Sequence, residues 1–275
     1  MVSTKSLRLA SGLTLLTFLG LAPASHAGLQ HVTVTIKNLA PANSVSFAPL
    51  RLGFGNGTFD SFNNGQSAGT PPTSAIISVA EGGSGSAWFP AFAAAEPAAI
   101  TGSVGGALLP GASASSTFTF DTANANNRFF TFANMVIPSN DLFLGNDNPA
   151  AFQLFNPDGS LAITTINQTA GQIWDANSEV ADALNAAFLV GGNNSLRTPE
   201  NGLVAFDRSE LSTYNGLTTA AGYTFSDAAL TNSTPIYQIS FTSSAAPEPG
   251  TFVFMAAALG LVGFKRGRAL LQAKK

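Results

Sequence analysis

The chain contains no cysteine, and only 10% of its 275 residues are charged. The missing cysteines exclude disulfide bonds, thiol nucleophiles and thiolate metal sites. Histidine is nearly as scarce, with two residues, which argues against a zinc site built from several histidines. The formal net charge of −3 argues against nucleic acid as a partner, because such binding needs a basic face to meet phosphates.

The first 27 residues have the three parts of a secretory signal peptide. Lys5 and Arg8 form a basic start, an apolar run extends from Leu13 to Leu21, and Ser25-His26-Ala27 is a small-x-small cleavage site. The apolar run is too short to cross about 30 Å of hydrocarbon comfortably. We therefore expect cleavage after Ala27 and export of the remaining chain.

A second address signal is found at the C-terminal end. Residues 243–250 form a linker that ends in Pro-Glu-Pro-Gly, residues 251–264 are apolar, and residues 265–275 are basic. At about 1.5 Å per residue, an apolar helix of this length reaches roughly 21 Å. We expect it to enter the inner membrane with help from neighbouring residues or bilayer thinning. The basic tail is expected on the cytoplasmic side.

This C-terminal pattern resembles the PEP-CTERM sorting signal of Gram-negative bacteria that produce exopolysaccharide. The resemblance covers residues 247–268. It implies an exosortase-type processing enzyme as a partner, which releases or re-anchors the protein outside the inner membrane. The alternative is an ordinary C-terminal membrane anchor. Both interpretations predict an exported body.

The body between these signals is acidic. From Gly28 to Ala246 there are five basic and fourteen acidic residues, which leaves a net charge of −9. Six of the acids, and no lysine or arginine, lie between Phe129 and Leu196. Uncompensated acids attract cations and repel anionic polymers. Calcium in particular takes oxygen ligands and needs carboxylates to offset its charge.

Alternating apolar and polar residues predict several half-buried strands. β-branched and aromatic residues dominate these runs, as is typical of strands. The clearest runs are residues 31–37, 116–120, 129–136 and 236–241.

Turn and helix signals complete this fold prediction. The turn Asn156-Pro157-Asp158-Gly159 predicts a hairpin between residues 151–155 and 160–165. Helical signal is limited to residues 88–96 and 182–188, and Gly- and Ser-rich residues 57–75 and 101–116 are interpreted as loops. We therefore predict an all-β fold, a single-domain antiparallel β-sandwich over residues 28–242.

Two tracts carry carboxylates that one metal ion could share. Asp141 follows a predicted strand, and Asp175 and Glu179 lie four residues apart in a later tract. If the later tract is a tight loop or a helix start, its two acids converge. Asp141 then completes a cage of three carboxylates, provided that its loop lies at the same end of the sandwich. The alternative is structural, with Asp175 as a helix N-cap and Glu179 favoured by the helix dipole.

These tracts carry a resemblance to the spondin N-terminal domain, an extracellular β-sandwich of animal matrix proteins and bacterial secreted proteins. The resemblance covers residues 30–242. It includes the His31–Lys37 strand, the Phe47-Ala48-Pro49 segment, the Met135–Phe143 tract and the Trp174–Val180 tract. It implies Ca²⁺ as a cofactor at Asp141, Asp175 and Glu179. The chain departs from the family at Asn177-Ser178, where Gly-Thr is usual, and in lacking the animal members' cysteines.

Together these features predict an exported, non-enzymatic calcium-binding protein of the cell surface or exopolysaccharide matrix. Its expected partner is an extracellular polysaccharide or a surface protein. One alternative is a polysaccharide-active enzyme, because paired carboxylates about 5 to 9 Å apart serve glycosidases. Another is a carbohydrate-binding module. After removal of the signal peptide, His31 is the only histidine. A Ser-His-Asp relay would therefore depend on His31, which the strand pattern turns towards solvent.

Overall fold

The computed structural model describes residues 28–246. The signal peptide expected at 1–27 lies outside these residues, as do the Pro-Glu-Pro motif, the membrane helix expected at 251–264 and the basic tail. Within the described residues, no helix combines the length and the apolar character that a membrane crossing requires.

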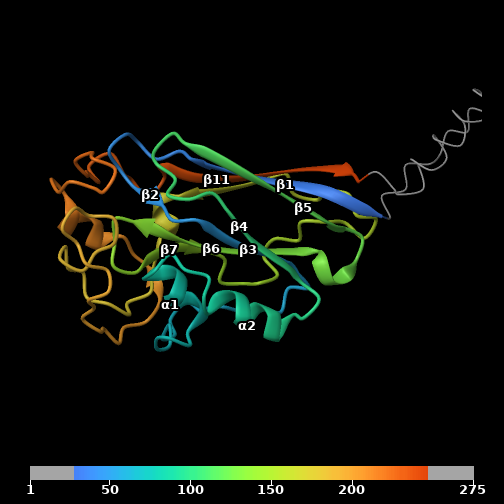
Figure 1. Cartoon of the computed structure of the whole chain (residues 1–275), viewed down its shortest axis with the longest axis horizontal. Helices are drawn as coiled ribbons and strands as arrows, with labels where there is room; N and C mark the ends of the chain where they lie inside the picture. Colours follow the sequence, from blue (N-terminus) through green and yellow to red (C-terminus); the bar gives the residue numbers. More distant parts are fainter. Residues whose placement is uncertain (1–27, 247–275) are drawn as a thin grey trace, which may run out of the picture.

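Two antiparallel sheets form the protein. The first has the strand order β5 (Ser113–Asp121), β1 (Leu29–Asn38), β11 (Pro235–Ala245), β8 (Thr165–Thr169). The second has the order β10 (Ala205–Phe206), β9 (Trp174–Asp175), β7 (Leu142–Gly145), β6 (Phe129–Ile137), β3 (Leu50–Gly55), β4 (Ile100–Val104), and β2 (Ser46–Phe47) also pairs with β6. Figure 1 shows the sheets as two layers, with helices α1 (Ala75–Ala80) and α2 (Trp88–Ala95) outside the second.

The first sheet is half-buried, as its alternating sequence predicts. On β1, Val32, Val34 and Ile36 are fully buried against the second sheet. The outward hydroxyl of Thr33 pairs with the hydroxyl of Thr117 on β5 at 2.8 Å. Apolar side chains thus line one face of this sheet, while paired hydroxyl groups line the other.

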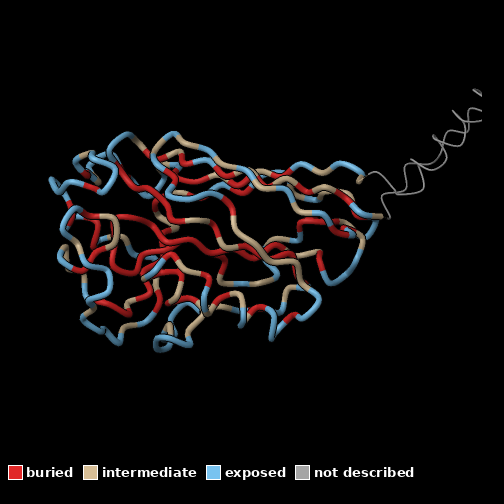
Figure 2. The backbone as a smooth tube through the Cα atoms, in the orientation of Figure 1, coloured by how far each residue is buried: buried red, intermediate tan, exposed pale blue. Residues whose placement is uncertain are grey.

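Aromatic side chains from both sheets fill the space between the layers. Phe54 of β3 contacts Phe120 of β5 with ring centroids 4.6 Å apart. Phe130 of β6 meets Phe241 of β11 at 4.9 Å. Figure 2 shows buried residues, in red, along the strands of both layers. The many phenylalanines therefore form the main core.

The central strands β6 and β7 of the second sheet are buried on both faces because α1 and α2 cover its outer side. Trp88 and Phe92 of α2 are fully buried in a second core cluster, which also includes Phe143 of β7 and Trp174 of β9. Every residue of β6 after Phe129 is buried. Burial on both faces explains why this strand is apolar with little alternation.

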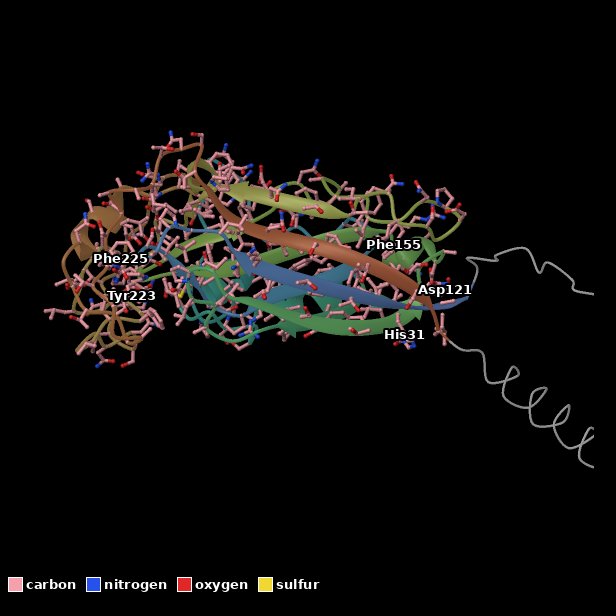
Figure 3. The ribbon with its side chains drawn as sticks, turned by 90° about the horizontal axis from the view of Figure 1, so that it is seen from above. His31, Asp121, Phe155, Tyr223 and Phe225 are labelled. Carbon is pink, nitrogen blue, oxygen red and sulfur yellow. The ribbon has the colours of Figure 1, made fainter. Side chains whose placement is uncertain are left out.

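The ends of the molecule differ in character. Seen from above in Figure 3, His31 and Asp121 lie at one end of the first sheet, and Tyr223 and Phe225 lie at the other. The loops that follow β9 gather at the Tyr223 end, drawn in yellow to orange in Figure 1. His31 is on the outer face, where its Nδ1 hydrogen-bonds the Thr119 hydroxyl at 2.8 Å.

The coarse prediction of a mostly β fold with two antiparallel sheets is confirmed, and the four predicted strands correspond to β1, β5, β6 and β11. The helix at residues 88–96 is also present, as α2. The last strand continues to Ala245, so the predicted linker begins three residues too early. β11 extends this far because its backbone pairs with β1, where Ala245 lies opposite Gln30.

Two local predictions were wrong. Residues 101–116 are not a loop, because they contain most of β4 and the start of β5, whose Ser- and Gly-rich sequence is held by pairing with neighbours. Residues 182–188 form turns rather than a helix. The predicted turn at 156–159 is present, and a short hairpin surrounds it, with Phe155 bridged to Leu161 and the Ala162 N–H donating to the Leu154 carbonyl at 2.8 Å. α1 has no counterpart in the prediction.

Candidate metal centre

Three carboxylates meet at the end of the second sheet where β7, β9 and β10 pair side by side. Asp141 immediately precedes β7, Asp175 ends β9, and Glu210 lies in the 3₁₀ helix η3 (Ser209–Tyr214) that follows β10. One carboxylate oxygen from each lies within 4.8 Å of those of the other two. All three side chains are buried.

Asp141 is held firmly by one of its two oxygens. Its Oδ2 accepts hydrogen bonds from the Ser178 backbone N–H at 2.6 Å, the Ser178 hydroxyl at 3.0 Å and the Glu179 backbone N–H at 3.0 Å. The other oxygen, Oδ1, is buried and accepts no hydrogen bond. A buried oxygen without a donor is costly. A carboxylate oriented by outer partners, with one oxygen left available, is the usual arrangement of a metal ligand.

The loop that follows Asp175 is a tight turn. Asn177 adopts a left-handed backbone with φ 48°, which asparagine tolerates better than most residues. Its backbone N–H donates to Asp175 Oδ1 at 2.7 Å, and its side-chain amide donates to the Leu203 carbonyl at 2.9 Å. Gly202 packs so closely that an added Cβ would lie 2.5 Å from that of Asn177. No helix begins at Asp175, so the helix-cap alternative is wrong.

The structure brings two of the three predicted site residues together and places Glu210, not Glu179, beside them. Asp141 and Asp175 lie together, whereas Glu179 is outside the close group and Glu210 is inside it. The reason is that Glu179 approaches Asp141 through its backbone N–H, while its carboxylate turns to accept a hydrogen bond from Asn140 Nδ2 at 3.1 Å. Nothing in the sequence around Glu210 signals this role, because it depends on the two-residue pairing of β9 with β10.

Asn140 ties the neighbouring acids to one another. Its backbone N–H donates to Glu210 Oε1 at 3.3 Å, and its side-chain amide donates to Glu179. Its side-chain oxygen accepts the Tyr214 hydroxyl at 2.5 Å. Asn140 therefore fixes the positions of Glu179 and Glu210 relative to the Asp141 loop.

Glu81 and Arg197 brace the site from outside. They form an ion pair at 2.7 Å, and Arg197 also donates to the Ser178 carbonyl at 2.8 Å. Glu81 Oε1 also lies 2.9 Å from the Ser178 hydroxyl oxygen, so Glu81 and Asp141 share its single hydrogen. This brace holds the loop whose N–H groups orient Asp141.

Burial and mutual repulsion disfavour ionisation of the clustered acids. Burial, followed by the negative charge of Asp141, raises the pKa of Asp175 to about 7. Burial is also the main reason that the pKa of Glu179 rises to about 7 and that the pKa values of Asp141 and Glu210 rise. Two arrangements remove this repulsion: protons retained by the carboxyl groups, or a cation shared between them.

An acidic cavity of about 310 Å³ opens beside the group. Among the described residues that line it, none is a lysine or arginine. Five of them are acids: Asp175, Glu179, Glu200, Asp207 and Glu210. A cation can therefore approach the group through an opening of favourable charge.

The donor set fits calcium. Calcium takes six to eight oxygen ligands at about 2.3–2.6 Å, so oxygens on opposite sides of one ion lie about 5 Å apart. The three carboxylate oxygens lie within 4.8 Å of one another, which is compatible with one shared ion. The three carboxylates would supply hard oxygens with a combined charge of −3 when ionised, and the unpaired Oδ1 of Asp141 would gain a partner.

Comparison with known proteins does not assign a family or a ligand to this site. A scan of the chain against protein-family models finds no match, and a search of curated proteins finds no significant match.

Proposed function

We propose that this chain is an exported, non-enzymatic protein that binds Ca²⁺ through Asp141, Asp175 and Glu210 and acts at the cell surface or in the exopolysaccharide matrix. The observation that carries the calcium site is the buried, unpaired Oδ1 of Asp141 in a group of carboxylates within 4.8 Å of one another. Glu179 lines the adjoining cavity and supports the site from its edge.

Calcium would have a structural role at this end of the molecule. The three acids belong to the turn before β7, the end of β9 and η3, which are joined here by short strand pairings and by hydrogen bonds through Asp141 and Asn140. An ion that binds only the folded state stabilises it by mass action. It would also fix the loops around the cavity as a surface for a polysaccharide or a surface protein.

The spondin resemblance supports this interpretation. Two packed antiparallel sheets agree with a β-sandwich, and the tracts that carry the resemblance supply Asp141 and Asp175. In this proposal Glu210 takes the part that the resemblance implied for Glu179. The partner proposed for this surface is an extracellular polysaccharide or a surface protein.

Calcium titration by calorimetry of the full-length protein tests the site and its third ligand. We expect one ion per chain. Asp175→Asn and Glu210→Gln are each expected to weaken binding by about 100-fold or more, whereas loss of an outer group, as in Glu179→Gln, is expected to cost about 10-fold. Asp60→Asn, a change at an exposed acid, is the control and should match the wild type. Equal losses from Glu179→Gln and Glu210→Gln would contradict the assignment of the third ligand.

The export route is proposed from the two terminal signals. Cleavage after Ala27 would release the body, and the Pro-Glu-Pro signal at 247–268 would present it to an exosortase, with residues 251–264 held transiently in the inner membrane. In a Gram-negative host that has an exosortase, the mature protein is expected outside the cytoplasm with Gly28 as its first residue. Ala27→Leu, which removes the small residue at the cleavage site, should leave a longer precursor. A cytoplasmic protein that retains residues 1–27 would contradict the route.

A further inference from the structure

A second depression adjoins the acidic cavity. It measures about 260 Å³ and is lined by Phe206, Asp207, Arg208 and Asn232, among others. Asp207 lines both depressions. A ligand longer than one small ring can therefore extend from the carboxylate group across Asp207 to Phe206.

Phe206 presents a supported aromatic ring at this second depression. It is 52% exposed, and it is the one aromatic residue among the large exposed apolar side chains of the described chain. Its ring stacks on Trp174 with centroids 3.6 Å apart and an interplanar angle of 24°. Trp174 is itself fixed by a hydrogen bond from its indole N–H to the Gly145 carbonyl at 3.1 Å. The exposed ring is therefore held in place before any ligand arrives.

The charges around the acidic cavity select the kind of ligand. Glu179, Glu200 and Asp207 surround the approach to the three carboxylates, so an anionic ligand is repelled. A neutral ligand rich in hydroxyl groups meets acceptors for its O–H donors in the same acids. Three carboxylates also leave several of the six to eight oxygen positions of calcium to be filled from elsewhere.

The geometry points to a neutral saccharide as the ligand of these two depressions, with hydroxyl oxygens completing the calcium shell and a neighbouring sugar ring stacked on Phe206. The apolar C–H face of a sugar ring suits an aromatic surface, and Arg208 and Asn232 offer N–H donors beside it. This inference rests on the proposed calcium function and names the partner class of the same site.

Calorimetric titration with neutral saccharides tests the inference on the calcium-loaded full-length protein. The probes are oligosaccharides of mannose, galactose and glucose, with oligogalacturonate as the anionic comparison. We expect binding of at least one neutral probe and none of oligogalacturonate, and we expect EDTA to abolish the binding. Phe206→Ala should weaken it about 10-fold, which corresponds to the upper range for an aromatic contact, whereas Phe206→Tyr keeps the ring and should stay within about 2-fold.

Calcium affinity measured on the same samples separates the two proposals. It should remain within about 2-fold in both Phe206 variants, since Phe206 is not a ligand. Leu184→Ala, at another exposed apolar residue (70% exposed), is the matched control. Calcium binding without binding of any neutral probe overturns the saccharide inference alone, as does tighter binding of oligogalacturonate or indifference to Phe206→Ala. Absence of calcium binding overturns the proposed function and this inference together.

Discussion

Calcium added to the metal-free full-length protein at pH 8 is expected to raise its melting temperature by on the order of 10 °C. At a calcium concentration of 1,000 times Kd, binding to the folded state alone contributes about 4 kcal/mol. For a protein of this size, each kcal/mol shifts the melting temperature by about 2–4 °C. Relief of the repulsion among Asp141, Asp175 and Glu210 is one source of the affinity and is already contained in Kd, so this linkage is the whole gain. Calorimetric melting curves with EDTA and with excess calcium give the measurement.

The same melting curves of the Asp175→Asn variant give a more specific test of the site. This substitution removes one of three crowded negative charges, so it is expected to raise the melting temperature of the metal-free protein at pH 8. A 100-fold loss of affinity lowers the calcium contribution from about 4 to about 1.4 kcal/mol, so the calcium response should fall to about a third or less. Asp60→Asn should leave both temperatures unchanged. A metal-free Asp175→Asn protein that is less stable than the wild type would indicate that the carboxylate has a structural role. An undiminished calcium response would place the ion elsewhere.

The position of Asp141 and Asp175 could be predicted because local sequence determines much of it. Asp141 follows a long apolar strand, and Asp175 begins a tract whose Asn177 tolerates the left-handed turn found there. Each tract therefore places its acid at a strand end by local rules. The two acids come together because β7 pairs with β9. Local sequence does not show this pairing, and it was the resemblance that related the two tracts to each other.

The third acid could not be predicted from the same rules. Glu179 was favoured because it lies four residues from Asp175, but its backbone N–H is used by Asp141 and its carboxylate turns to Asn140. Glu210 arrives through β10, a strand of two residues with no alternation to detect. Nearness in sequence is a poor guide here, since a short pairing between remote segments positions Glu210 beside the two aspartates.

The same distinction explains the errors in the fold. β1 and β11 bury regularly spaced apolar residues, so their period of two was visible. β4 and the start of β5 carry mainly Gly, Ser and Ala, and they form strands because neighbouring strands offer backbone partners. Residues 182–188 contain good helix formers, but the backbone of Ala187 pairs with Ser139 instead. Tertiary pairing overrides weak local preference in each of these segments.

The stability of the metal-free protein is expected to fall as pH rises from 5 to 8. In the folded state, burial raises the pKa of Asp175 from 3.8 to about 7, so at intermediate pH the folded protein holds a proton that the unfolded chain has lost. Stability then decreases with pH until the folded group ionises. At about 1.4 kcal/mol per pKa unit, the whole rise corresponds to roughly 4 kcal/mol, of which roughly 3 kcal/mol is lost between pH 5 and pH 8. The raised pKa values of Glu179 and Glu210 act in the same direction.

Calcium should reverse this dependence, because a cation stabilises the ionised carboxylates and competes with their protons. The melting-temperature gain from calcium is therefore expected to be small at pH 5 and to reach its full size by pH 8. Asp175→Asn, whose amide does not titrate, should flatten the metal-free pH profile, and the difference between the two profiles isolates the contribution of this acid. A wild-type protein equally stable at pH 5 and pH 8 without metal, or a calcium gain independent of pH, would show that the cluster does not retain protons when the ion is absent.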